Sequence, residues 1–135
     1  GVGKTFLSNC VAKELLDRGH SVIYFTAFEL FHVFEKNVFE RAQDMALPYQ
    51  NIFDCDLLII DDLGTEMINK FVISQLFQCL NERLIQEKST IISTNLSLQE
   101  FRNTYSERIF SRIIENYSWQ KIYGDDIRFK KSNLT

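Results

Sequence analysis

Apolar residues recur along the chain at two spacings, one typical of amphipathic helices and the other of buried strands. From Thr5 to Asp17, the apolar side chains fall on one face of a helix, and Gly19 is a stop signal after it. A long helix is also predicted from Asn69 to Glu87, where apolar residues recur every four positions. Runs rich in β-branched and aromatic residues predict strands at 21–26, 56–62, 90–94, 119–123 and 127–130.

Helix starts are marked by Ser/Thr-x-x-Glu capping boxes at 26–29, 97–100 and 104–107. The first box opens a helix that fades near Asp44, and Pro48, the only proline, predicts a loop after it. A final helix is expected from Ser106 to Asn116. Because strands alternate with helices, the pattern predicts an α/β fold with three layers, in which helices cover both faces of a mostly parallel sheet.

The chain begins with Gly1-Val2-Gly3-Lys4-Thr5, which matches the second half of the phosphate-binding loop G-x-x-x-x-G-K-[ST]. Glycines let backbone N–H groups point at phosphate oxygens, while Lys4 can reach the β- and γ-phosphates and the Thr5 hydroxyl can ligate Mg²⁺. Taken alone, these residues also suit a glycine turn before a helix. A phosphate loop normally follows a buried strand and none precedes Gly1, so we expect a fragment of a longer polypeptide that lacks this strand.

A second motif stands about 55 residues later, where Leu57-Leu58-Ile59-Ile60 runs into Asp61 and Asp62. Acids at the carboxyl end of a buried strand lie where ligands of open α/β sheets bind, as in a Walker B motif. Asp61 would hold Mg²⁺, directly or through water, and Asp62 would orient the attacking water. The alternative for this stretch alone is a strand that ends in an acidic turn.

Two further polar residues suit the same chemistry. Asn95 follows the predicted strand at 90–94 and could hydrogen-bond the γ-phosphate or the attacking water, although asparagine is also common at the start of a turn. In the helix after Ser106, Arg108 and Arg112 lie four residues apart on the polar face and repel each other. A phosphate would offset this repulsion, and so would the neighbouring glutamates of an ordinary solvated face.

Composition narrows the class of protein. The chain has 135 residues, 45% hydrophobic and 24% charged, which predicts one soluble globular domain, and no apolar run approaches the ~20 residues of a membrane span. The net charge of −3 allows only weak, salt-dependent binding of single-stranded DNA, with Lys121, Lys130 and Lys131 as candidate contacts. The three cysteines lack metal-site spacing, and we interpret them as buried free thiols of a cytoplasmic protein.

Taken together and in order, the motifs resemble those of the DnaC/DnaI helicase loaders, a clade of AAA+ ATPases that also includes the IstB transposition helpers. They are G-V-G-K-T, L-L-I-I-D-D-L-G-T-E, N-E-R-L, T-I-I-S-T-N, S-E-R-I-F-S-R-I and G-D-D-I-R, and they span essentially the whole chain. The resemblance implies a single AAA+ P-loop NTPase domain over residues 1–135, without a separate lid domain.

The same resemblance assigns roles to individual residues. Lys4 and Thr5 match the Walker A residues, Asp61 and Asp62 the Walker B residues, and Asn95 the sensor 1 residue. Arg112 matches the arginine finger that reaches the γ-phosphate of a neighbouring subunit, and Arg128 lies where the family has a possible sensor 2 arginine. Asn81 and Arg83 match an N-x-R motif without an assigned role, and Leu84 replaces the tyrosine that often follows it.

These roles imply an ATPase that uses ATP and Mg²⁺ and self-assembles so that one subunit completes the site of the next. The expected function is loading a DnaB-type replicative helicase onto DNA. Three alternatives stay open: an IstB-like helper that directs a transposase, a nucleotide-gated binding module with little hydrolysis, and a P-loop small-molecule kinase. The kinase would need an acceptor pocket and an arginine-rich lid, which the sequence does not contain.

Overall fold

The computed structural model describes residues 3–39, 46–64 and 69–118. Helices and strands follow one another in the order α1 (Lys4–Asp17), β1 (Val22–Thr26), α2 (Ala27–Phe39), α3 (Ala46–Asp54), β2 (Leu57–Leu63), α4 (Lys70–Ile85), β3 (Ser89–Thr94), α5 (Leu98–Thr104) and α6 (Glu107–Asn116). The strands predicted at 119–123 and 127–130 lie outside the described residues.

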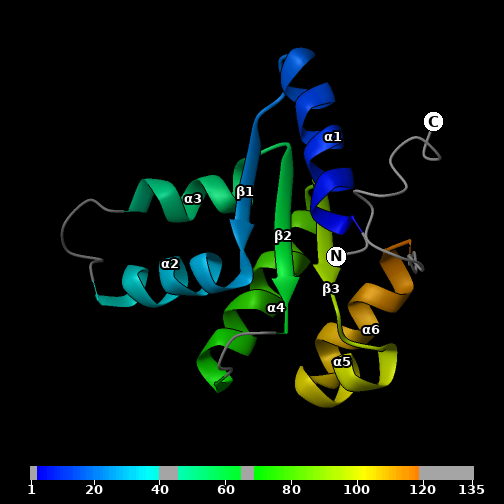
Figure 1. Cartoon of the computed structure of the whole chain (residues 1–135). Helices are drawn as coiled ribbons and strands as arrows, with labels where there is room; N and C mark the ends of the chain where they lie inside the picture. Colours follow the sequence, from blue (N-terminus) through cyan, green and yellow to red (C-terminus); the bar gives the residue numbers. More distant parts are fainter. Residues whose placement is uncertain (1–2, 40–45, 65–68, 119–135) are drawn as a thin grey trace.

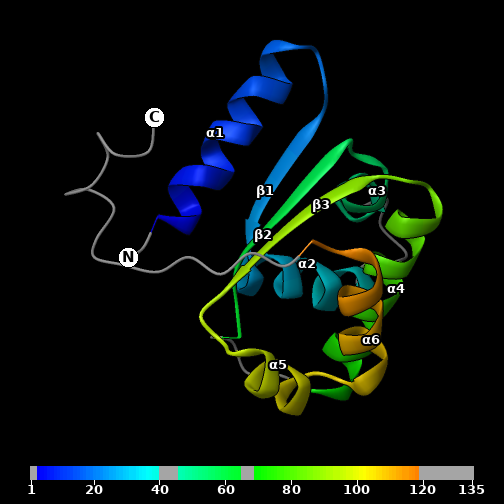
Figure 2. The ribbon, with the colours of Figure 1, turned by 90° about the vertical axis from the view of Figure 1, so that its right-hand side faces the viewer.

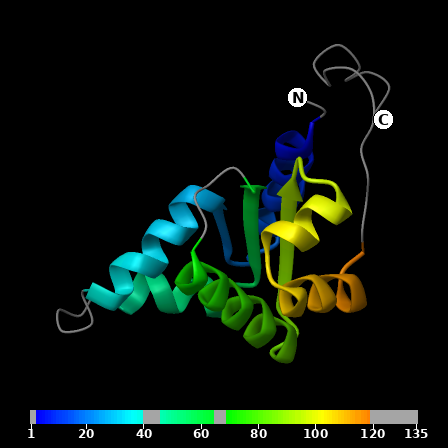
Figure 3. The ribbon, with the colours of Figure 1, turned by 90° about the horizontal axis from the view of Figure 1, so that it is seen from below.

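The described strands form one parallel sheet in the order β1-β2-β3, and all three arrows point the same way (Figure 1). Helix α1 covers one face, while α2, α3, α4 and α6 lie on the other (Figures 2 and 3). The fold is therefore α/β with three layers, as predicted. Because the strands are parallel, their carboxyl ends share one edge of the sheet, and the acids of β2 lie there.

Most of the buried apolar side chains lie between the sheet and the helices opposite α1. The central strand β2 is buried at every position except Asp62, and α4 contributes Val72, Leu76 and Leu80. This core anchors the end of β2 that carries the acids.

The face of α1 is less covered. Ser8 is its only buried residue, whereas Leu7 and Val11 are 39% and 42% exposed. A cavity of about 1060 Å³ lies between this face and β3, which pairs only with β2 among the described residues. None of the helices in the described ranges is long and apolar enough to cross a membrane.

The capping predictions were right at two of three sites. The Ser97–Glu100 box is complete, and Thr26 Oγ1 accepts a hydrogen bond from the Glu29 amide at 3.2 Å. The third box was wrong, because the α5 helix extends through residue 104 and Ser106 alone caps α6, accepting from the Ile109 amide.

Two further expectations were wrong. Pro48 lies in the first turn of α3 rather than in a loop; proline is tolerated there because no intrahelical partner awaits its missing N–H. Cys55 and Cys79 are buried free thiols as expected, but Cys10 is exposed on the outer side of α1. Spacing along a helix defines a face, and it does not say what covers that face.

Candidate nucleotide-binding site

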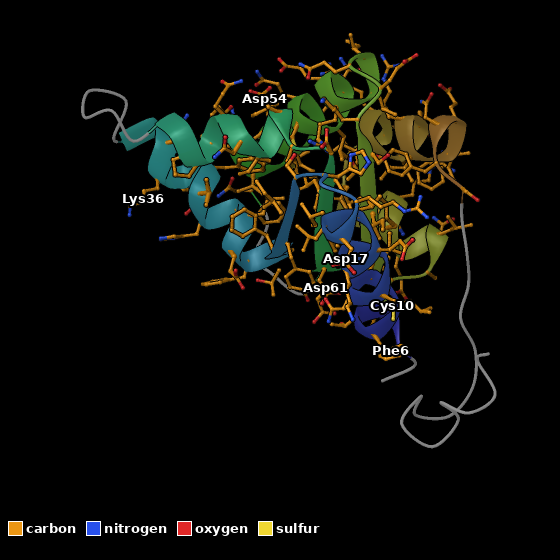
Figure 4. The ribbon with its side chains drawn as sticks, turned by 90° about the horizontal axis from the view of Figure 1, so that it is seen from above. Phe6, Cys10, Asp17, Lys36, Asp54 and Asp61 are labelled. Atoms are coloured by element: carbon orange, nitrogen blue, oxygen red, sulfur yellow. The ribbon has the colours of Figure 1, made fainter. Side chains whose placement is uncertain are left out.

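Three hydroxyl groups converge on the carboxylate of Asp61, which is only 8% exposed. Thr5 Oγ1 of α1 donates to Asp61 Oδ2 at 2.9 Å, and the Tyr24 hydroxyl of β1 donates to the same oxygen. Ser93 Oγ of β3 donates to Oδ1. Asp61 lies beside α1 in the side-chain view (Figure 4). One carboxylate thus joins the helix to all three strands.

This arrangement favours the ionised form of Asp61. Burial by itself raises the pKa of a carboxyl group, but the hydrogen bonds from Ser93, Tyr24 and Thr5 outweigh it, and the pKa lies below its ordinary value. Burial and the bond to the Asp61 carboxylate raise the pKa of Tyr24 to about 12, so the phenol keeps its proton. A charged carboxylate surrounded by neutral donors is suited to receive a cation.

The amino end of α1 lies next to this carboxylate. Gly3 precedes the helix with φ of 92°, a left-handed conformation that glycine adopts without strain, and no side chain among the described residues caps the helix. Its first N–H groups and its dipole therefore present positive charge. Lys4 opens the helix, where the dipole disfavours a cation, and its Nζ donates to Asn95 Oδ1 at 2.7 Å. A bound anion at this position would accept hydrogen bonds from the uncapped N–H groups of α1 and would balance the charge of Lys4 at the positive end of the helix dipole.

Asp62 has a different environment from its neighbour. Strand β2 is irregular between Ile60 and Leu63, and Asp62 adopts φ of 64°, so its side chain leaves the strand alternation and is exposed. Its amide donates to Ser93 Oγ at 3.0 Å, which links it to the group that holds Asp61. Gly64 then takes φ of 109°, and a Cβ there would lie 2.6 Å from the Leu96 side chain.

The structure thus brings together Lys4, Thr5, Asp61 and Asn95, with Asp62 at the same end of the sheet. Arg112 is exposed on α6, and within the described ranges its guanidinium makes no hydrogen bond or ion pair. Gly1, Val2 and Arg128, and the candidate DNA contacts Lys121, Lys130 and Lys131, lie outside the described residues.

Tyr24 and Ser93 were missed by the sequence analysis. Both look like ordinary strand residues, since Tyr24 stands in an apolar run and Ser93 in Thr90-Ile91-Ile92-Ser93-Thr94. Their contact with Asp61 depends on the order and register of three strands. Period-two alternation could have marked them as facing the same side as Asp61, but only with that register known.

Arg83, left without a role above, is fully buried at the opposite end of the sheet. Its guanidinium donates to the carbonyl oxygens of Ile52, Phe53, Cys55 and Ser89 at 2.6–3.2 Å, and to Thr90 Oγ1 at 2.9 Å. It therefore binds the carboxyl end of α3 to the starts of β2 and β3. This arginine stabilises the fold and is not part of the site around Asp61.

The residues present fit a metal–nucleotide. The Thr5 hydroxyl and the Asp61 carboxylate offer adjacent oxygen ligands of the kind Mg²⁺ takes together with phosphate oxygens and water. The uncapped amides of α1 and the Lys4 ammonium suit phosphate oxygens. The arrangement therefore suits the phosphates of a nucleotide bound together with a divalent cation.

Comparison with known proteins places the chain among ATP-binding proteins. The chain is 25% identical to the replicative helicase loader DnaC of Escherichia coli K12 over 129 residues, which are 95% of this chain and 53% of DnaC. It is 30% identical to the replicative helicase loader DnaI of Bacillus subtilis over 115 residues, 80% of this chain and 35% of DnaI. The chain thus spans about half of DnaC and about a third of DnaI.

Solved structures share the fold. A crystal structure of the DnaC helicase loader matches 91% of this chain and 73% of its own, with a TM-score of 0.79 at 24% identity. AMPPCP-bound DnaA from Aquifex aeolicus matches 99% of this chain and 42% of its own, with a TM-score of 0.77 at 27% identity. A family model described as IstB-like ATP binding protein matches residues 1–135. The chain therefore belongs to the IstB-like ATP-binding protein family.

Proposed function

We propose that this chain is the ATPase domain of a replicative helicase loader, in which bound ATP controls assembly on a DnaB-type helicase. The observation that carries the proposal is the meeting of Lys4, Thr5, Asp61 and Asn95 at one end of the sheet. The two relatives named above as replicative helicase loaders support the choice of partner.

In this site each residue has a defined task. Lys4 and the amides of α1 bind the β- and γ-phosphates, and Asn95, which receives a hydrogen bond from Lys4, lies close enough to contact the same γ-phosphate. Thr5 and Asp61 hold Mg²⁺. The metal supplies charge neutralisation at the phosphate oxygens. Gly1 and Val2 would complete the phosphate loop, and Arg128 would contact the nucleotide.

Hydrolysis depends on Asp62. Its exposed carboxylate lies next to the metal-holding Asp61, where it orients the water that attacks the γ-phosphorus. Aspartate is one methylene shorter than the glutamate common at this position in related ATPases. We therefore expect slow hydrolysis that accelerates when a neighbouring subunit contributes Arg112, which suits a timed switch.

Nucleotide binding is tested with Lys4→Ala. Removing the ammonium should weaken ATP binding about 10- to 100-fold, because charge-assisted hydrogen bonds contribute about 1.5–3 kcal/mol and 1.4 kcal/mol is a factor of ten. Isothermal titration with ATP and Mg²⁺ measures the effect. Lys13→Ala, an exposed lysine on the same helix, is the matched control. Equal affinities for the two variants would contradict the phosphate-loop assignment.

A helper that directs a transposase is the second candidate, because the matching family is described as IstB-like. The two functions share this domain and differ in partner. Co-purification with ATP bound, against a DnaB-type helicase in one arm and an IstB-associated transposase in the other, separates them. Weak binding of single-stranded DNA through Lys121, Lys130 and Lys131 stays a prediction for either.

A further inference from the structure

Tyr24 lies in the middle of β1, and the register of the sheet brings it to the metal-holding acid. Tyr24 pairs with Ile59, and Thr26 pairs with Asp61. Side chains two positions apart on a strand share a face, so Tyr24, Ile59 and Asp61 all point toward α1. The Tyr24 side chain therefore extends diagonally, from its position beside Ile59 toward Asp61 two residues further along β2. Its hydroxyl donates a hydrogen bond to Asp61 Oδ2.

The Asp61 carboxylate is held at both oxygens. A carboxylate has about four acceptor positions, and hydroxyl donors take three of them. Oδ2 accepts from Tyr24 and Thr5, and Oδ1 accepts from Ser93. Rotation of the carboxylate would break all three bonds. A cation, or a water bound to it, would meet Asp61 through a lone pair whose direction these three bonds fix.

Burial alone does not explain the bond from Tyr24. The side chain is 37% exposed, so water could satisfy its hydroxyl without Asp61. The Thr5 hydroxyl differs from that of Tyr24, since in the proposed site it is also a cation ligand. The Ser93 hydroxyl differs because it also accepts a hydrogen bond from the Asp62 amide. The Tyr24 hydroxyl lies beside Thr5 and donates its proton to the Asp61 carboxylate, so its bond bears directly on the orientation of Asp61.

We propose that Tyr24 is a positioning residue of the metal–nucleotide site, which orients the Asp61 carboxylate to receive the divalent cation. The proposal rests on the proposed function, because it needs a metal–nucleotide at this site. It assigns Tyr24 no contact with the nucleotide. Loss of its hydroxyl should therefore affect cation-dependent binding and leave cation-free binding unchanged.

The test measures the affinity for a fluorescent ATP analogue in EDTA and along a Mg²⁺ titration. Tyr24→Phe keeps the ring and removes the hydroxyl. The Mg²⁺ concentration at half-effect should rise about tenfold, the lower end of what loss of a group that orients a metal ligand costs, while affinity in EDTA stays at the wild-type value. Tyr49→Phe is the matched control, since it also removes one hydroxyl bond, at 2.9 Å to Gln75 on the far side of the sheet.

Thermal unfolding of both variants checks that each is folded. A Mg²⁺ titration of Tyr24→Phe that coincides with that of Tyr49→Phe would overturn the positioning role and leave the proposed function intact. Equal loss of affinity in EDTA and in Mg²⁺ would also overturn it, since that result indicates a general disturbance of the site. If the wild-type protein bound the analogue without any response to Mg²⁺, the proposed function itself would fall.

Discussion

Adjacent residues Asp61 and Asp62 are chemically identical but have different backbones and surroundings. Asp61 continues the strand, and its carboxylate accepts hydrogen bonds from three hydroxyl groups. Asp62, in contrast, takes φ of 64° and is exposed. Asparagine, aspartate and glycine tolerate this left-handed conformation better than longer side chains do. The backbone therefore offers a physical reason why aspartate stands here in place of glutamate.

The proposed role of Asp62 is tested with Asp62→Asn. Asparagine suits the same backbone, so the fold and ATP affinity should be preserved, while turnover should fall about 100-fold because a neutral amide orients the attacking water less strongly than a carboxylate does. Asp17→Asn, on the exposed end of α1, is the control for charge loss. Single-turnover hydrolysis and ATP titration measure the two effects separately. Parallel losses of binding and turnover would assign Asp62 to metal binding or to the fold.

At the scale of elements, Arg83 of α4 joins the carboxyl end of α3 to the starts of β2 and β3. The carbonyl groups at the end of α3 carry the negative end of its helix dipole, and two of them accept from Arg83 Nη1. The fork of the guanidinium reaches β3 as well, through Ser89 O at 2.6 Å and Thr90 Oγ1. Burial of this cation is compensated by backbone dipoles, since no carboxylate is bonded to it among the described residues.

Arg83→Lys should lower the free energy of unfolding by about 2–6 kcal/mol. A lysine has three donors at one point, so at least two of the buried acceptors lose their partner, at about 1–3 kcal/mol each. Urea unfolding followed by circular dichroism measures the loss. Arg18→Lys, in an exposed ion pair with Glu14, should change stability by less than about 0.5 kcal/mol. The same stability for both variants would refute the structural role of Arg83.

At the scale of the whole molecule, one face of α6 packs against the core and the opposite face is exposed. Ile109 and Ile113 are buried against the core, and the Arg108 guanidinium lies 4.1 Å from the ring centroid of Phe77 in α4. Arg108 is thus bound within its own subunit, while Arg112 is exposed one turn later. Of the two arginines, Arg112 is therefore the one that we propose for contact with a neighbouring subunit.

Action of Arg112 in trans is tested by mixing two inactive variants, Lys4→Ala and Arg112→Ala. Each should hydrolyse ATP at a small fraction of the wild-type rate, because an arginine finger contributes about 10³–10⁵ to the rate in related systems. In co-assembled mixtures, an intact Lys4 site can meet an intact Arg112, so turnover should partly recover. A mixture of Lys4→Ala with Lys4→Ala/Arg18→Ala is the control and should not recover. Absence of recovery in assemblies shown to contain both variants would leave Arg112 as a member of a solvated helix face.

Some residues and elements were predicted from the sequence, and others were missed for reasons that particular residues show. The motif spacing located Lys4, Thr5, Asp61 and Asn95, and the structure brings these four side chains together. Helix α3 was missed because Pro48 indicates a loop everywhere except in a first helical turn. The capping box predicted at Thr104 was wrong: Thr104 and Glu107 have the spacing of a capping box, but Thr104 is the last residue of α5, and Ser106 is the residue that caps α6.

The sequence by itself determined the α/β class, the three strands of the described sheet, the described helices other than α3, and the motifs of the site, because these depend on local spacing and on residues near one another in the chain. Only the tertiary structure decided that Tyr24 and Ser93 hold Asp61, that Arg83 binds backbone carbonyls, and that Asp62 leaves the strand alternation. Each of these contacts joins residues about 30 or more positions apart or depends on strand register. Local periodicity carries no information about which strand lies beside which, and that pairing decides what each side chain touches.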